Sequence, residues 1–298
     1  MKTNADIVFE AERKQLLGLC YRILGSRADA EDVVQDVAVR WLKADIDEIR
    51  NPVAWLRKAC THRSIDQLRK RERLIYTGEW LPEPIETDAL GSAEQQIIQV
   101  ETVQTAFLIT LDRLGAHERA AFILHQVFGH SYKYVAQLLG KSEVACRKSI
   151  SRARAKLKML DPAEPNDAIE QQKDMVVAFT QAVETGDTAI LETMLVGDVV
   201  LRAAGGGKVL ALEEPMVGRS EVCAFVAHVS QNFWAEFDFE PRELNASLGL
   251  VGFKGDQAKV ALMFQLSENG PANQIFVVRN PDKLCYLRRS ASQVARLI

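Results

Sequence analysis

The sequence lacks several features that would assign it to common classes of protein. No apolar run approaches the length needed to span a bilayer, and Met1–Asn4 leads into a charged helix rather than a signal peptide. The five cysteines are scattered and none forms a C-x-x-C pair, so neither a zinc site nor a disulfide framework is indicated. We therefore expect a cytoplasmic protein with reduced thiols, no metal, no cofactor and no membrane partner.

The sequence also lacks a large excess of charge of one sign, because its net charge is only -3. This balance argues against a protein that coats nucleic acid generally, and it makes the placement of charge the informative quantity. At 298 residues, of which 47% are hydrophobic, the chain is long enough for two or three globular domains.

The segment from His130 to Lys158 has the pattern of two short helices around a tight corner at Gly140. Ser131 and Ser142 stand where N-caps belong, and Gly140 stands where a left-handed C-cap belongs. The apolar residues of the second helix have the spacing of one buried stripe: Cys146, Ile150, Ala153 and Leu157. Residues 141–158 hold seven Lys or Arg against one acid. This is the pattern of a helix-turn-helix, although a basic solvated helix in an α bundle is the alternative.

A second basic helix lies earlier in the chain, and an acidic segment separates the two. Three helices are expected in the first part of the chain. The first spans Phe9–Leu24, the second begins after a cap at Ser26, and the third begins at Asn51–Pro52. Residues 57–73 of the last one hold seven Lys or Arg. The segment from Gly78 to Glu94 then has five acids, no base, two prolines and two glycines, which predicts an extended linker.

The final third of the chain has the pattern of an α+β domain. A helix is expected over Ala168–Glu184 and another over Val222–Phe237. Short β-rich runs surround the second helix: Val199–Leu201, Lys208–Leu212, Leu248–Phe253, Ala258–Leu266 and Gln274–Val278. A module of this length favours a curved antiparallel sheet covered by helices.

Residues 6–160 resemble an extracytoplasmic-function (ECF) bacterial sigma factor. The resemblance rests on SRADAEDVVQDVAVRWL, NPVAWLRKACTHRSIDQLRKRER and HSYKYVAQLLGKSEVACRKSISRARAKL, in the order and spacing of that family. It implies partners, namely core RNA polymerase through its β′ clamp helices and β subunit, and promoter DNA. The acidic linker supports a sigma factor over an ordinary DNA-binding repressor. A repressor would gain nothing from an acidic segment, because DNA phosphates repel carboxylates.

The resemblance also implies roles for individual residues. The residues expected to dock on core polymerase are Asp29, Asp32, Gln35 and Asp36. Those expected at the minus-ten element are His62, Arg63, Asp66, Arg69 and Lys70. Those expected at the minus-thirty-five element are Ser142, Glu143, Arg147, Lys148, Ser151, Arg152 and Arg154. Arginine suits bidentate contacts to guanine, whereas the last two arginines suit phosphates.

The C-terminal third resembles the SnoaL-like cone-shaped α+β domain, which is fused to one subgroup of ECF sigma factors. Three short segments carry this resemblance: WLPEP in the linker, GGGK and NPDKL. The expected interdomain or regulatory residues are Trp80, Pro82, Gly205, Gly206, Gly207, Lys208, Asn280 and Asp282. In this subgroup the tail modulates sigma activity.

The expected organisation is therefore two all-α sigma domains followed by one SnoaL-like domain. Sigma domain 2 spans 1–76, the acidic linker 77–95, sigma domain 4 with the helix-turn-helix 96–160, a second linker 161–167 and the regulatory domain 168–298. The leading hypothesis is a sigma factor without catalytic residues. The alternative is a helix-turn-helix regulator whose tail senses a small molecule, a ligand that nothing in the sequence supports. A tail enzyme ranks third, because His228, Asp238 and Asp256 are too scattered to form an acid–base pair.

Overall fold

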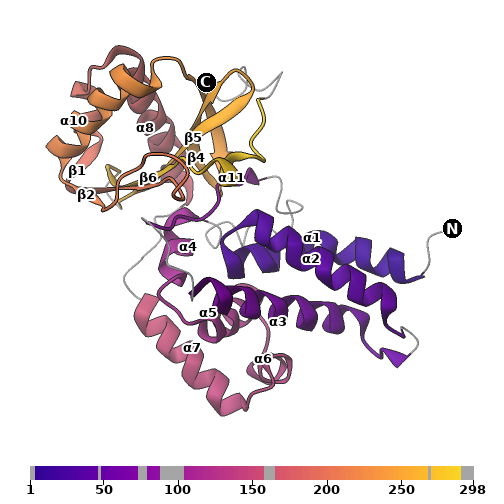
Figure 1. Cartoon of the computed structure of the whole chain (residues 1–298). Coiled ribbons are helices and arrows are strands. Elements are labelled where there is room, and N and C mark those ends of the chain that lie inside the picture. Colours follow the sequence, from indigo (N-terminus) through magenta and orange to yellow (C-terminus); the bar gives the residue numbers. More distant parts are fainter. Residues whose placement is uncertain are drawn as a thin grey trace. The chain divides into compact units, whose positions relative to one another are not determined.

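The structure is a computed structural model, and it describes residues 4–45, 48–72, 79–87, 104–157, 165–267 and 270–289 (Figure 1). The described residues divide into two units. The first contains those of 1–75 and 107–160, and the second contains 79–87, 104–106 and those of 161–298. The predicted break at 161–164 and the linker residues 77, 78 and 88–95 lie outside the described part.

Three helices form the N-terminal half of the first unit: α1 (Asn4–Leu24), α2 (Arg27–Lys43) and α3 (Pro52–Glu72). The predicted cap at Ser26 is confirmed, since Ser26 Oγ accepts from Asp29 N at 3.2 Å; Asn51 Oδ1 accepts from Ala54 N at 3.0 Å at the predicted start of α3. The helices bury an apolar face that includes Trp41 and Leu56. Trp55 packs against Trp41 with ring centroids 5.4 Å apart.

The second half of the first unit contains the helix-turn-helix. It consists of α4 (Thr105–Leu111), whose first two residues belong to the second unit, α5 (Ala116–Phe122), the π-helical turn η5 (Ile123–Val127), α6 (Tyr132–Leu139) and α7 (Glu143–Leu157). Ser131 and Ser142 cap α6 and α7 as predicted. Gly140 adopts φ 64, the left-handed conformation that lets the chain turn between them. The stripe of Cys146, Ile150 and Ala153 is buried, which confirms the helix-turn-helix.

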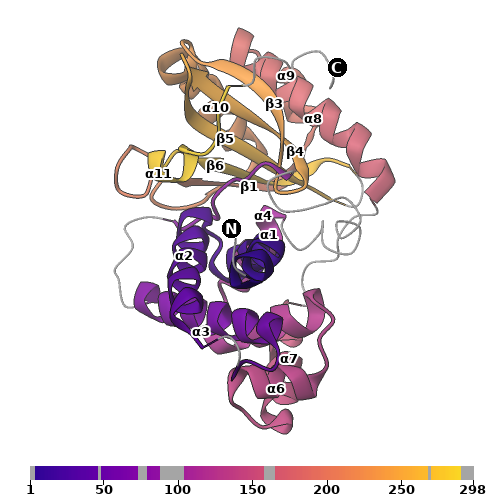
Figure 2. The same ribbon diagram turned by 90° about the vertical axis from the view of Figure 1, so that its right-hand side faces the viewer.

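The second unit is a six-stranded sheet with helices packed on it (Figure 2). The strands are β1 (Leu195–Ala204), β2 (Met216–Val217), β3 (Asp238–Leu244), β4 (Ser247–Lys254), β5 (Gln257–Leu266) and β6 (Ala272–Val278). Their order is β2-β1-β6-β5-β4-β3. The expected α+β class is confirmed, but the sheet is mixed, because β1 runs parallel to β6.

The core of this unit lies between the sheet and the helices α8 (Pro165–Thr185), α9 (Ala189–Thr193) and α10 (Arg219–Val229). The π-helical turn η6 (Ser230–Trp234) continues α10, and a short helix α11 (Pro281–Leu284) follows β6. Phe179 of α8 packs against Phe264 of β5 with centroids 5.3 Å apart. The core therefore belongs to this unit alone.

One strand prediction was wrong, and two strands, β2 and β3, were not predicted. Residues 208–212 form a loop, because Gly206 and Gly207 have φ 64 and 70 and turn the chain away from β1. The place beside β1 is taken instead by β2, with Val200 opposite Val217. β3 was not predicted because Pro241 lies inside it. Since β3 is an edge strand, the missing N–H of Pro241 costs no hydrogen bond between strands.

Candidate nucleic-acid interface

The basic face of α7 is open to solvent. Six of the seven residues predicted to read the upstream element are exposed and Glu143 is half-buried. Arg147 donates to Glu143 Oε1 at 2.7 Å and lies over the Tyr132 ring at 4.7 Å. Arg154 bonds Gln126 Oε1, with its Nε at 3.2 Å. These contacts hold two guanidinium groups in fixed positions on the surface of a helix that can enter a major groove.

The five residues of α3 predicted to contact the minus-ten element divide into an exposed group and a half-buried group. Asp66, Arg69 and Lys70 are exposed. Arg63 is half-buried and donates to Asp36 Oδ2 on α2, with its Nη2 at 2.7 Å. His62 is also half-buried, and its Nε2 lies 2.7 Å from the carbonyl oxygen of Leu138 on α6. The predicted minus-ten residues therefore share one helix, but they do not share one environment.

The acids of α2 lie beside this helix. Asp32 and Gln35 are exposed, whereas Asp29 is half-buried and accepts from Gln67 Nε2 at 3.2 Å. Two residues of the predicted polymerase-binding set are thus bonded to α3: Asp36 to Arg63 and Asp29 to Gln67. Asp32, Gln35 and Asp36 are exposed, and only Asp29 is half-buried.

Within the first unit, α3 packs against the helix-turn-helix half. Arg71 of α3 donates to Asp112 at 2.9 Å and to the Leu24 carbonyl at 2.8 Å. Arg119 of α5 is 1% exposed and donates to the same Asp112 and to the Arg22 carbonyl. Burial of the guanidinium and, to a smaller extent, the charge of Arg71 lower the pKa of Arg119 to about 9. Sequence reasoning missed this contact, since its members are far apart in the chain.

Positive charge from both halves gathers around one histidine of α5. Burial lowers the pKa of His117, and the charges of Arg69 on α3 and Lys141 before α7 lower it further. Arg69 of α3 and Lys141 of the turn before α7 therefore contribute to one positive field, which the charge of Asp66 partly offsets. Such a field attracts a polyanion before any base is read.

The linker segment 79–87 is docked on the second unit, to which it belongs. Leu81, Glu83 and Ile85 are each no more than 2% exposed. The amide of Ile85 donates to Asn245 Oδ1 at 3.1 Å, and the Asn245 amide donates to the Ile85 carbonyl at 2.9 Å. Glu79 also forms an ion pair with Arg202 of β1. The segment is extended, as its prolines predict.

The NPDKL segment holds the same linker from the other side. Lys283 is buried, donates to the Leu81 carbonyl and lies over the Trp80 ring at 4.7 Å. Asn280 caps α11 by accepting from Asp282 N at 3.1 Å. Pro82 is buried within this contact. The predicted regulatory residues of the linker and of NPDKL are therefore brought together.

The GGGK segment is the turn that receives NPDKL. A Cβ on Gly205 would collide with the Val209 carbonyl, and one on Gly206 would collide with the Asn280 side chain. Lys208 forms an ion pair with Asp282 at 2.6 Å. The backbone carbonyl of Ala204 accepts from the amides of Arg279 and Asn280. Close packing within its own loop thus explains Gly205, and close packing against Asn280 explains Gly206. Gly207 lies exposed at the tip of the turn.

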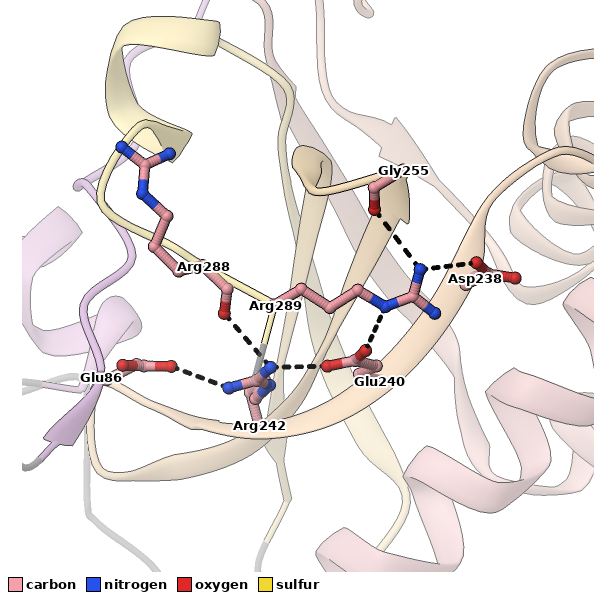
Figure 3. A network of polar contacts seen from close by, with 7 residues as sticks. All are labelled: Glu86, Asp238, Glu240, Arg242, Gly255, Arg288 and Arg289. Carbon is pink, nitrogen blue, oxygen red and sulfur yellow. Dashed lines mark hydrogen bonds and ion pairs between the residues drawn. The ribbon is translucent and has the colours of Figure 1, made fainter. Parts of the chain in front are cut away.

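A charged network at the linker's far end was not predicted. Asp238, Glu240 and Arg242 alternate along β3, so they share one face of the strand (Figure 3). Arg242 Nη2 donates to Glu240 at 2.5 Å and its Nη1 donates to Glu86 of the linker at 3.1 Å. Arg289 bonds both Glu240 and Asp238 at 3.0 Å. The period-two alternation of charge in this run was the available signal.

Other kinds of site find no support in the described part of the chain. No three His, Cys, Asp or Glu side chains there are grouped so that they could hold a metal ion. No described helix combines the length and the apolarity that a bilayer crossing requires. Of the three candidates for a tail enzyme, Asp238 pairs with Arg289, and Asp256 lies in an exposed turn.

Comparison with known proteins identifies both basic regions. Residues 8–74 match the family described as Sigma-70 region 2, and residues 106–157 match Sigma-70, region 4. The ECF sigma factor SigJ of Mycobacterium tuberculosis is 30% identical over 92% of this chain and 91% of its own length. The probable ECF sigma factor SigI of the same organism is 28% identical over 73% of this chain and 83% of its own.

The fold comparison covers the C-terminal unit as well. The crystal structure of M. tuberculosis SigJ matches with a TM-score of 0.71 and 28% identity, covering 94% of this chain and 98% of that one. The chain therefore belongs to the ECF RNA polymerase sigma factors, and within them it is of the SigJ type with a SnoaL-like C-terminal domain. It is a non-enzymatic initiation factor that binds core RNA polymerase and directs it to specific promoters.

Proposed function

We propose that this sigma factor is regulated by its own C-terminal domain, which acts by holding the linker between its two promoter-binding domains. The division is 1–76 for domain 2, 77–95 for the linker, 96–160 for domain 4, 161–167 for the second linker and 168–298 for the regulator. The observation that carries the proposal is the docking of 79–87 on the second unit through Asn245, Lys283 and Arg242. The site of action is the cytoplasm, where the chromosome is transcribed.

Polymerase docking is assigned to the exposed side of α2. Asp32 and Gln35 are free to meet a basic partner surface, and Asp29 and Asp36 extend the same acidic face. The pairs of Asp36 with Arg63 and of Asp29 with Gln67 position both carboxylates, and the Asp36 side chain stays 50% exposed. An acidic helix start against a basic partner also gains from electrostatic steering.

Minus-ten recognition is assigned to α3, with Asp66, Arg69 and Lys70 facing the DNA. His62 and Arg63 are engaged in the structure, by the Leu138 carbonyl and by Asp36. The packing of α3 against α5 and α6 therefore keeps part of the reading surface closed. Opening of that packing would free His62, and binding to polymerase and DNA would supply the free energy.

Minus-thirty-five recognition is assigned to the exposed face of α7. Arg147 stands near the start of the helix, where recognition helices contact base edges. Ser142, Glu143, Lys148 and Ser151 flank it on the presented face. Arg152 and Arg154 lie further along and suit phosphate contacts, which position the helix without reading sequence.

Replacing Arg147 with alanine should lower transcription from the cognate promoter about 10-fold or more, because one bidentate base contact contributes roughly 1–3 kcal/mol. The promoter is found by selecting DNA with the wild-type holoenzyme, and run-off transcripts are then compared. Affinity for core polymerase should not change. Arg113→Ala, which removes an exposed arginine with no assigned role, is the matched control. Equal losses of polymerase binding and of transcription would refute the assignment of Arg147.

Regulation by the tail is assigned to linker restraint. The described residues near both ends of the connection between the two sigma domains, 79–87 and 104–106, belong to the second unit. Thr105 is 6% exposed, and its hydroxyl lies 3.0 Å from Met263 Sδ of β5. A connection held at both ends limits how far domain 4 can separate from domain 2. We therefore assign the docked linker to a restrained form of low activity.

Asn245→Gly should release the linker and raise transcription several-fold without changing promoter choice. Asn245 has φ 52, which glycine adopts freely, so the variant keeps the turn and removes the acceptor for the Ile85 amide. Hydrogen exchange at Ile85 should speed up about 10-fold, as expected for one lost hydrogen bond of ~1.4 kcal/mol.

Ala246→Gly is the matched control, because it changes the same turn, where Ala246 has φ 59, and leaves the Asn245 side chain in place. That variant should keep wild-type exchange at Ile85 and wild-type transcript yield. If Asn245→Gly accelerates exchange at Ile85 while the yield stays constant, linker restraint is not how the tail acts.

A further inference from the structure

A cavity of about 340 Å³ opens in the C-terminal unit beside the segments that hold the linker. It lies between α10 with η6 on one side and strands β1 and β6 on the other. The loop that follows GGGK closes a third side through Leu210. Its size falls at the lower end of the range of small-molecule pockets. The lining is mostly apolar and includes Phe225, Phe233 and Trp234.

One cation faces this apolar space. Arg279, directly after β6, lines the cavity, and its Nη1 donates to the Leu210 carbonyl at 2.7 Å. Its Nε is buried and has no hydrogen-bond partner among the described residues. No ion pair to Arg279 is formed within the described part of the chain either. Burial lowers the pKa of Arg279, yet arginine remains charged at neutral pH.

An unneutralised guanidinium in an apolar cavity favours a particular class of occupant. Arg279 is half-buried at the wall of the cavity, and a carboxylate is the acceptor that fits its planar guanidinium fork. The aromatic side chains favour a flat apolar body. Leu210 is 76% exposed and Phe233 is 49% exposed at the edge of the cavity, so an occupant would also cover apolar surface now facing water.

We infer that this cavity is a binding site for a small apolar carboxylic acid, with its carboxylate on Arg279 and its body among Phe225, Phe233 and Trp234. The π-helical turn that carries the last two residues widens the helix locally, a distortion often found at binding sites. His228 of α10 supplies a second polar group on the same wall.

The position of the site connects it with the linker. Arg279 directly precedes Asn280, and Leu210 lies two residues after Lys208, so both walls continue into the turn closed by the Lys208–Asp282 ion pair. The same turn carries Lys283, which holds Leu81. A bound acid would therefore act on the segments that hold the linker; this consequence rests on the proposed function, whereas the site itself does not.

The test is binding of 2-naphthoate to the full-length protein, measured by calorimetry without polymerase, so its outcome is independent of the proposed regulation. The uncharged 2-naphthamide, which has the same shape, is the control ligand. The acid should bind with a dissociation constant below about 1 mM, and about 10-fold or more tightly than the amide, because a charge-assisted contact to Arg279 is lost in the amide.

Two variants locate the contact. Arg279→Gln should remove the preference for the acid and retain binding of the amide, which also shows that the cavity is intact. Arg279→Lys keeps the charge and should keep part of the preference. The inference is overturned if the acid does not bind at about 1 mM, if acid and amide bind equally to the wild type, or if Arg279→Gln still prefers the acid. Should Arg279→Gln fail to fold, the comparison of the two ligands on the wild type decides.

Discussion

Replacing Arg242 with alanine should lower the free energy of unfolding of the C-terminal unit by about 3 kcal/mol. Arg242 is 5% exposed and lies between Glu240 and Glu86, with its guanidinium 5.7 Å from the Phe253 ring (Figure 3). Its removal leaves the buried Glu240 carboxylate with Arg289 alone. Breaking a buried pair in this way is costly because one charge stays desolvated without full compensation. Arg289 keeps the loss near the lower end of the usual range.

Hydrogen exchange of the strand amides in β3–β6 measures this effect in the unit concerned. Glu86→Gln is the matched control, since it breaks the outer contact of the same guanidinium. The Glu86 side chain is 45% exposed, so its loss should cost less than about 1 kcal/mol. A change below about 1 kcal/mol for Arg242→Ala as well would mean that the network is not what stabilises this end of the sheet.

Reversing the charge of Asp32, by Asp32→Lys, should weaken binding to core RNA polymerase about 30-fold or more. An interface hot spot contributes about 2 kcal/mol or more, and the introduced cation adds repulsion against a basic partner surface. Asp32 is exposed on α2 and its side chain supports no described contact, so the fold should be unaffected. Binding is measured by titrating labelled core polymerase.

Glu10→Lys is the control for this experiment, because Glu10 is an exposed acid of α1 whose only described ion pair is a long one to Arg13, at 3.8 Å. It should bind core polymerase as the wild type does. If both variants weaken binding equally, net charge rather than the face of α2 determines affinity. If neither does, the polymerase-docking face lies elsewhere.

The helix-turn-helix could be predicted from the sequence because its determinants are local. Two serine caps, one left-handed glycine and one apolar stripe fix α6, the turn and α7, and each acts within a few residues. The exposure of the predicted face of α7 follows from the same periodicity. The acids of α2 and the basic residues of α3 were placed on their helices for the same reason.

The remainder depends on contacts between distant parts of the chain. Pairing of β1 with β6 joins residues more than seventy positions apart. The alternation of side chains along a strand does not show whether it pairs in parallel or antiparallel. The described part of the linker, 79–87, is extended as expected, but its prolines do not show that Leu81 and Ile85 are buried against Lys283 and Asn245. Arg242 was missed because Pro241 concealed the strand that presents it.

The most direct test of the account is run-off transcription with purified core RNA polymerase and the full-length protein, compared with Asn245→Gly and Ala246→Gly. The account predicts that all three proteins co-elute with the core enzyme and start at the same promoter, and that only Asn245→Gly gives several-fold more transcript. Absence of promoter-dependent transcripts and of co-elution would contradict the sigma factor function. Equal yields from the three proteins would contradict control through the linker.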